Sequence, residues 1–120
     1  MIAKRITAMF GILMLAAAAV AAQASKLEGT WEGKMDHEGV METITFDLHA
    51  KGEALTGKVF QNGKDLGDVS EAKIDGKKVH FKVDFLVFEG TIDGAHLKMT
   101  VTVYNGNKFS VDATPKKSGS

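Results

Sequence analysis

Apolar and polar residues alternate along most of the chain beyond residue 26. The alternation is clearest in four stretches, residues 27–34, 43–49, 79–85 and 97–104. β-branched and aromatic residues fill many of the apolar positions, as a half-buried pleated surface favours. A period of two turns one face of each strand to a core and the other to solvent, so the pattern predicts an antiparallel sheet.

Short polar turns separate the alternating stretches. Glycine marks five of them, at Lys51-Gly52-Glu53, Asn62-Gly63, Asp75-Gly76, Asp93-Gly94 and Asn105-Gly106. Asn-Gly and Asp-Gly supply the positive φ angles of a type I′ hairpin turn. Counting between turns predicts eight strands, at residues 27–35, 40–50, 53–60, 66–74, 77–84, 86–93, 95–104 and 107–113. The connection at Asp84-Phe85 has no glycine, so it is either a tight turn or a bend in one long strand.

The short connections predict that strands adjacent in sequence pair in space, as an up-and-down meander. Eight twisted strands in this order remove their open edges when the first pairs with the last. We therefore expect an all-β fold, a small eight-stranded antiparallel up-and-down β-barrel, with a β-sandwich as the alternative. Gly33, Gly57 and Gly90 fall inside strands, where kinks or close approaches at barrel corners explain glycine.

The first 24 residues have the pattern of a signal peptide. Lys4 and Arg5 precede an apolar run over residues 6–20, and Ala22-Gln23-Ala24 places small residues where signal peptidase cleaves. An uncleaved membrane anchor is the alternative, but the apolar run is short for a span. We expect a signal peptide at 1–24, a barrel domain at 25–114 and a disordered polar tail at 115–120. The mature protein would be periplasmic or secreted.

Composition narrows the function classes. The chain has no Cys, so disulfides cannot stabilise it even in an oxidising compartment. Cleavage would remove two of the 15 basic residues and none of the 15 acidic ones, which leaves a formal charge of −2. This balance favours neither nucleic acid nor an anionic membrane as a partner.

No residue pattern indicates catalysis or a cofactor. Ser70 and Ser110 have no evident paired base, and no Gly-x-Ser-x-Gly elbow is present. His37 lies beside Asp36 and Glu38, but a zinc site needs three or four converging ligands. The other histidines, at positions 49, 80 and 96, fall on polar strand positions or beside turns. We expect neither an enzyme nor a metal site.

Binding is the function that the pattern favours. An eight-stranded barrel is either filled by its own side chains or holds one small ligand. The candidates to line an apolar ligand site are bulky residues, Phe46, Phe60, Phe81, Phe85, Phe88, Met99 and Phe109. A protein partner or inhibited target bound through the barrel rim, where a turn would expose Phe85 and Leu86, is the second hypothesis.

The opening Gly29-Thr30-Trp31, the hairpin series and Leu55-Thr56-Gly57 resemble the calycins, which comprise lipocalins, fatty-acid-binding proteins and avidins. The resemblance implies a barrel in which Gly29 and Trp31 are structural. The chain departs from avidins, because residues 32–35 replace the biotin-binding loop. It also departs from lipocalins, because its one arginine, Arg5, cannot stack on the Trp. Small exported Gly-x-Trp-x-Gly β-domains of bacteria are the more similar group, and they imply fold and location but no activity.

Overall fold

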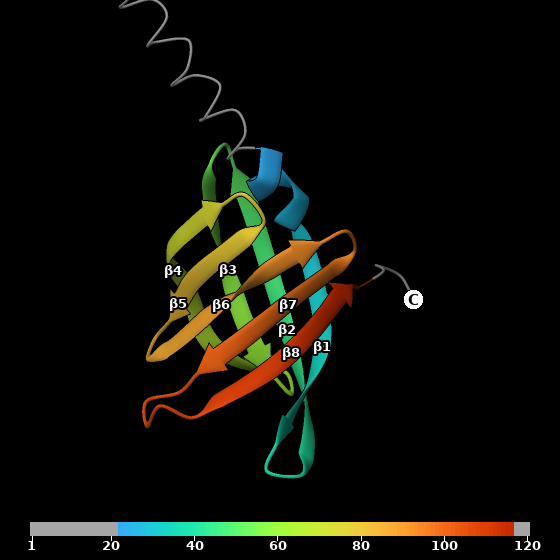
Figure 1. Ribbon diagram of the computed structural model, residues 1–120, viewed down its shortest axis with the longest axis vertical. Helices are drawn as coiled ribbons and strands as arrows, with labels where there is room; N and C mark the ends of the chain where they lie inside the picture. The colour runs from blue at the N-terminus through green and yellow to red at the C-terminus, as the bar shows by residue number, and fades with distance from the viewer. Residues whose placement is uncertain (1–21, 117–120) are drawn as a thin grey trace, which may run out of the picture.

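The computed structural model describes residues 22–116, which form one closed antiparallel β-barrel (Figure 1). Its eight strands are β1 Gly29–His37, β2 Val40–Lys51, β3 Ala54–Gln61, β4 Lys64–Asp75, β5 Lys78–Val83, β6 Leu86–Asp93, β7 His96–Thr102 and β8 Lys108–Pro115. Each strand pairs with its neighbours in the sequence, and β1 also pairs with β8. The predicted up-and-down barrel is confirmed, and the β-sandwich alternative is wrong.

Closure depends on the pairing of β1 with β8. The register runs from Trp31 opposite Pro115 to Met35 opposite Val111. β8 is two residues longer than the predicted strand at its C-terminal end, and beyond it Lys116 N donates to Thr30 O at 2.8 Å. Residues 117–120 of the predicted polar tail lie outside the described residues.

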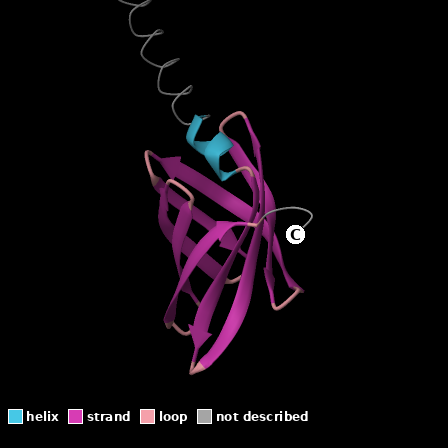
Figure 2. Cartoon of the chain, turned by 90° about the vertical axis from the view of Figure 1, so that its right-hand side faces the viewer, coloured by secondary structure: helices cyan, strands magenta, loops and turns pink. Residues whose placement is uncertain are grey.

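A short helix at residues 22–27 lies across one end of the barrel (Figures 1 and 2). Leu27, predicted in the first strand, is the last residue of this helix, and it is fully buried. Gly29 has φ +122°, where the chain turns from the helix into β1. The predicted cleavage site after Ala24 lies within the helix, and residues 1–21 of the predicted signal peptide are outside the described residues.

Trp31 joins the helix to the barrel wall. Its side chain is buried, and its Nε1–H donates to Leu27 O at 2.9 Å. A buried indole needs such a partner for its one donor. The bond fixes the last helical residue over the end of the core, so this end of the barrel is closed.

Replacing Trp31 with Phe is expected to lower the free energy of unfolding by about 2 kcal/mol, because the buried Leu27 carbonyl loses its donor. Urea denaturation measures the change in the free energy of unfolding. It is followed by far-ultraviolet circular dichroism, because the variant lacks the Trp fluorescence of the wild type. Tyr104→Phe is the control, because Tyr104 is 88% exposed and its hydroxyl should contribute little. Equal stability of Trp31→Phe and the wild type would contradict the role of this hydrogen bond.

The six two-residue hairpin turns between the described strands follow two designs. Asn62 and Gly63 are the two central residues of their turn, and both have positive φ, as predicted for type I′. At Asp75-Gly76 and Asp93-Gly94 the strand includes the Asp, and the glycine comes first in the loop: Gly76 and Gly94 both have φ +59°. A glycine at the first central position is typical of type II′ turns, so the type I′ prediction is wrong there.

The seventh connection, between β7 and β8, is a longer loop at residues 103–107. In this loop Gly106 but not Asn105 has positive φ, so the type I′ prediction is wrong for Asn105-Gly106.

The connection at Asp84-Phe85 is a tight turn rather than a bend. Val83 pairs with Leu86, so only two residues lie between β5 and β6. Asp84 takes the positive φ, +54°, that glycine takes elsewhere. Asp tolerates this conformation better than most residues, which explains a turn without glycine.

Side chains fill the centre of the barrel. Phe46, Phe81 and Phe88 contact one another: Phe46 meets the other two edge-on, and Phe81 stacks on Phe88 with ring centres 5.2 Å apart. Met99 is buried in the same core, and no described residue buries a side-chain polar atom without a partner. The interior is therefore a packed core rather than a deep ligand chamber.

Candidate functional site

The two ends of the barrel differ. The helix covers one end, whereas four loops surround the other, at residues 38–39, 62–63, 84–85 and 103–107. A cavity of about 110 Å³ opens at this second end, which we call the mouth. Most of its lining is apolar and comes from Met35, Ile44, Leu66, Leu86, Val101 and Val103. Phe88 lies one inward position deeper than Leu86, and Phe109 lines the mouth from β8.

One side of the mouth is polar. His37, Glu42 and Gln61 occupy inward strand positions where apolar residues stand elsewhere in the barrel: Glu42 pairs with buried Met35, and Gln61 pairs with buried Ile44. Gln61 Nε2 donates to Glu42 Oε2, and His37 Nδ1 lies 3.5 Å from the same oxygen. We call these three residues the polar wall.

The polar wall also touches the apolar lining. The His37 ring meets Phe109 edge-on, with ring centres 4.9 Å apart. The Glu42 side chain is only 15% exposed, compared with 42% for His37. The wall is therefore held on both sides, by polar contacts within it and by the aromatic ring beside it.

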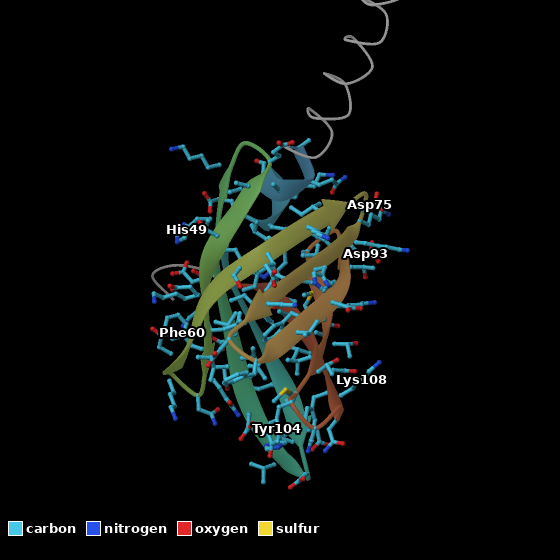
Figure 3. All side chains as sticks on the ribbon, turned by 90° about the vertical axis from the view of Figure 1, so that its left-hand side faces the viewer. His49, Phe60, Asp75, Asp93, Tyr104 and Lys108 are labelled. Atoms are coloured by element: carbon cyan, nitrogen blue, oxygen red, sulfur yellow. The ribbon has the colours of Figure 1, made fainter. Side chains whose placement is uncertain are left out.

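Large apolar side chains stand exposed around the mouth. They are Val40, Met41, Phe85 and Tyr104, with exposed fractions between 61% and 88%. Each lies in or beside one of the mouth loops, and Figure 3 shows Tyr104 at the end of the barrel away from the helix. We call these four residues the rim. Phe85 is exposed at the rim as the tight-turn alternative implies, whereas Leu86 is half-buried in the mouth.

The predicted ligand-site residues fall into three groups. Phe88 and Phe109 line the mouth, and Phe85 stands on the rim. Phe46, Phe81 and Met99 belong to the core below the mouth. Phe60 points outward from β3 and is partly exposed, because it follows the inward-facing Val59 and lies opposite Thr45 of β2 (Figure 3).

Sequence reasoning missed Glu42 and Gln61. Both occupy apolar-phase positions at the ends of strands, and a polar residue on that phase is the signal that identifies them. Leu66 and Val103 were also missed because each is a single aliphatic residue near a turn. Their contribution depends on how the barrel closes, since they come from β4 and the β7–β8 loop.

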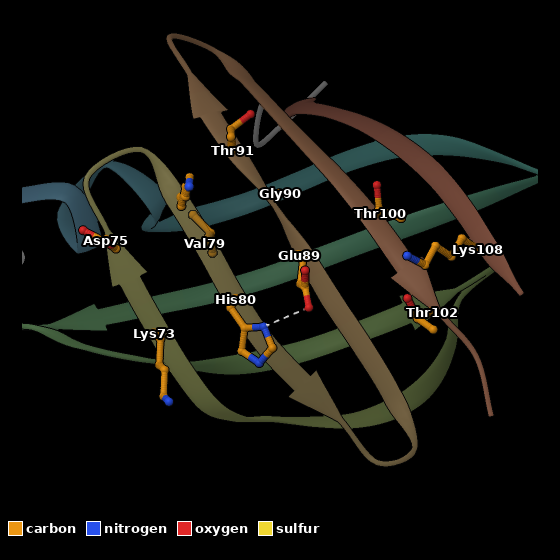
Figure 4. A pocket seen from close by; sticks show the side chains of 11 residues that line it. Lys73, Asp75, Val79, His80, Glu89, Gly90, Thr91, Thr100, Thr102 and Lys108 are labelled. Atoms are coloured by element: carbon orange, nitrogen blue, oxygen red, sulfur yellow. Dashed lines mark ion pairs between the residues drawn. The ribbon is translucent and has the colours of Figure 1, made fainter. Parts of the chain in front are cut away.

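A larger hollow of about 620 Å³ lies on the outer face of β4 to β8 (Figure 4). Its polar side chains include Lys73, Lys108 and the ion pair between His80 Nδ1 and Glu89 Oε1 at 3.5 Å. These are solvated residues on the polar phase of the sheet. The mouth is the better candidate, because it combines apolar walls with a few convergent polar groups.

Every described histidine lies beside a carboxylate. His37 is in the polar wall, and the other three are on the outer face, where His96 Nδ1 lies 3.0 Å from Asp112 Oδ1. Among residues 22–116, no three His, Asp or Glu side chains come together in a way that could hold a metal ion. Lys58 has the one marked electrostatic effect in this part of the chain: hydrogen bonds to Asp68 and Asp65 raise its pKa above the ordinary value.

Comparison with known proteins adds no assignment. No protein-family model matches the chain, and no curated protein matches it. In the described part of the chain, no helix has both the length and the apolar character needed to cross a membrane. The closed eight-stranded up-and-down barrel is consistent with a calycin-like fold, and this likeness rests on topology.

Proposed function

We propose that the protein is a non-catalytic binding protein whose mouth takes the apolar part of a small molecule. The observation that carries the proposal is the apolar cavity, open between four loops and bordered by the polar wall. Concave apolar sites with a few placed polar groups are the usual form of small-molecule sites. A packed core beneath the cavity supports binding at the mouth rather than deep inside.

The size of the cavity limits what enters it. An engineered apolar cavity of about 150 Å³ holds one benzene molecule. At about 110 Å³ the mouth holds less, so it would take a short alkyl chain or the edge of one ring. The remainder of the ligand would lie over the rim, where Met41, Phe85 and Tyr104 are exposed.

The proposal includes export. The positive start of the chain, its apolar run and Ala22-Gln23-Ala24 support signal-peptide cleavage and a periplasmic or secreted protein. The Gly29-Thr30-Trp31-Glu32-Gly33 opening supports membership of the small exported bacterial β-domains that it resembles. A proteomic identification of the mature N-terminus at Ser25 would test the predicted cleavage.

A protein-interaction or inhibitor module is the second candidate. The rim favours it, because four large apolar side chains are exposed at one end of the barrel. An apolar side chain of a partner could then occupy the mouth. A pull-down that loses its partner when Phe85 is replaced by Ser, together with no small-molecule binding, would favour this alternative.

Filling the mouth should weaken small-molecule binding. Val103→Phe places a ring in the cavity, so a bound ligand loses the burial of about one aliphatic group, worth about 1.5 kcal/mol. We expect the affinity for the neutral fluorophore N-phenyl-naphthylamine to fall about tenfold or more. Titration of the fluorophore, with its emission as the readout, measures this change.

Val87→Phe is the matched control. Val87 is half-buried on the outer phase of β6 and does not line the mouth, so this variant should bind as the wild type does. Thermal unfolding of both variants checks that each remains folded. Equal affinity of Val103→Phe and Val87→Phe for the fluorophore would place binding elsewhere than the mouth.

A further inference from the structure

The polar wall presents hydrogen-bond acceptors. Gln61 donates from its amide nitrogen to Glu42 Oε2. The Gln61 amide oxygen is therefore the atom left to accept a hydrogen bond from a ligand. His37 turns Nδ1 toward the same carboxylate, and with the ring hydrogen on Nδ1 its Nε2 is an acceptor. Glu42 itself carries only acceptor oxygens. The three side chains therefore complement a ligand group that donates hydrogen bonds.

The charges beside the cavity also favour a positively charged ligand. No Lys or Arg is among the described residues that line the cavity. Lys34 and Lys108 project from the outer phase: Lys34 Nζ donates to Thr43 Oγ1, and Lys108 lines the outer hollow. Lys64 lies opposite Gln61 at the edge of the mouth, but it is exposed to solvent and does not line the cavity. Glu42 does not itself line the cavity, but its carboxylate contacts His37 and Gln61, which do, and it is only 15% exposed. It therefore places a negative charge directly behind this part of the lining.

From this wall we infer the class of ligand: the mouth takes an amphipathic amine, with a short alkyl chain or one ring in the cavity and an ammonium group against the polar wall, where Glu42 supplies the negative charge. This inference rests on the proposed binding function and adds its chemical selectivity. An ammonium group has three donors and no acceptor, which matches the carboxylate, the Gln61 amide oxygen and His37 Nε2. A charged donor on a carboxylate makes one of the stronger hydrogen bonds.

A fatty acid of the same length is the wrong partner for this wall. Its carboxylate would bring acceptors to acceptors and a negative charge to the Glu42 carboxylate. Low exposure of Glu42 limits the screening of that repulsion by solvent and salt. Selectivity for amines over carboxylates is thus set by Glu42, whereas affinity for the apolar tail is set by the cavity.

Three probes with one tail separate these contributions: hexylamine, hexanol and hexanoate, measured by displacement of N-phenyl-naphthylamine at pH 7. At this pH the amine is charged as a Lys side chain is, and hexanoate is charged as a Glu side chain is. We expect hexylamine to bind at least about tenfold more tightly than hexanoate, with hexanol between them. Glu42→Gln should lower the affinity for hexylamine about tenfold and leave that for hexanol unchanged.

Glu89→Gln is the matched control. Glu89 pairs with His80 at the same 3.5 Å that separates Glu42 from His37, but it lies on the outer face. This variant should keep the wild-type order of affinities. Hexanol binding with no preference for hexylamine would overturn the inference and leave the proposed function intact, whereas failure of all three probes to bind would overturn both. The comparison of probes on the wild type needs no variant, so it decides the question even if Glu42→Gln does not fold.

Discussion

Gly57→Ala is expected to lower the free energy of unfolding by about 4 kcal/mol. Gly57 has φ +146°, a conformation that residues with a side chain rarely adopt, and the strain costs about 1–3 kcal/mol. A Cβ atom at this position would also collide with the Asp47 carbonyl oxygen of β2. Overpacking of this kind costs a further 1–3 kcal/mol or so. The total free energy of unfolding of a native domain is only about 5–15 kcal/mol, so the loss would be severe.

Two other glycines separate the strain from the collision. Gly90 has no positive φ, but its Cβ atom would collide with the Lys98 carbonyl oxygen and lie 2.7 Å from Met99 Sδ. Gly63 has φ +83° in an open turn, where an added methyl group would meet no atom within 4 Å. We expect losses of about 3 kcal/mol for Gly90→Ala and about 1 kcal/mol for Gly63→Ala.

Urea denaturation of the three variants, followed by circular dichroism, measures the series. The expected order of destabilisation is Gly57, then Gly90, then Gly63. A loss at Gly90 no larger than at Gly63 would contradict the close approach of β6 and β7, which the structure shows at Gly90 opposite Met99. A loss at Gly57 equal to that at Gly63 would mean that β2 moves away from β3 at little cost.

Most of the fold could be predicted because its determinants are local. Alternation identified the strands, and the Asn62-Gly63 pair fixed a turn whose two residues both need positive φ. Gly76 and Gly94 were placed in the right turns but in the wrong turn type, because the register decides whether the preceding Asp belongs to the strand. The helix at residues 22–27 was missed, since Leu27 fits the alternation of the strand that follows it.

The site was predicted less well, because it depends on pairings between distant strands. Trp31 was expected to be structural, but its hydrogen bond to Leu27 requires the helix that the sequence did not reveal. Phe88 and Phe109 were named as candidates on bulk alone, and bulk does not distinguish the mouth from the core where Phe46 lies. The sequence around Glu42 does not indicate that Gln61 is its hydrogen-bond partner, because Gln61 is 19 residues away in the sequence.

Phe88→Ala is expected to convert the shallow mouth into a deeper ligand site. Phe88 is 2% exposed, lines the mouth and stacks on Phe81, so its removal joins the cavity to the space that its ring occupied. Truncation of a buried Phe costs about 3–5 kcal/mol, which denaturation in the absence of ligand would show. The enlarged apolar cavity should take a whole aromatic ring, as dry engineered cavities do. We expect affinity for N-phenyl-naphthylamine to rise at least about tenfold.

Phe46→Ala distinguishes an opened mouth from a loosened core. Phe46 is fully buried, meets Phe88 edge-on with ring centres 5.7 Å apart, and does not line the mouth. Its truncation should cost a similar free energy, yet Phe88 would still separate the new space from the mouth, so affinity for the fluorophore should change little. Ligand at about 100 times its dissociation constant should raise the free energy of unfolding of the Phe88→Ala variant by about 2.7 kcal/mol. Equal gains in affinity for both variants would mean that ligand enters through a loosened barrel wall, and the mouth would not be the route to the interior.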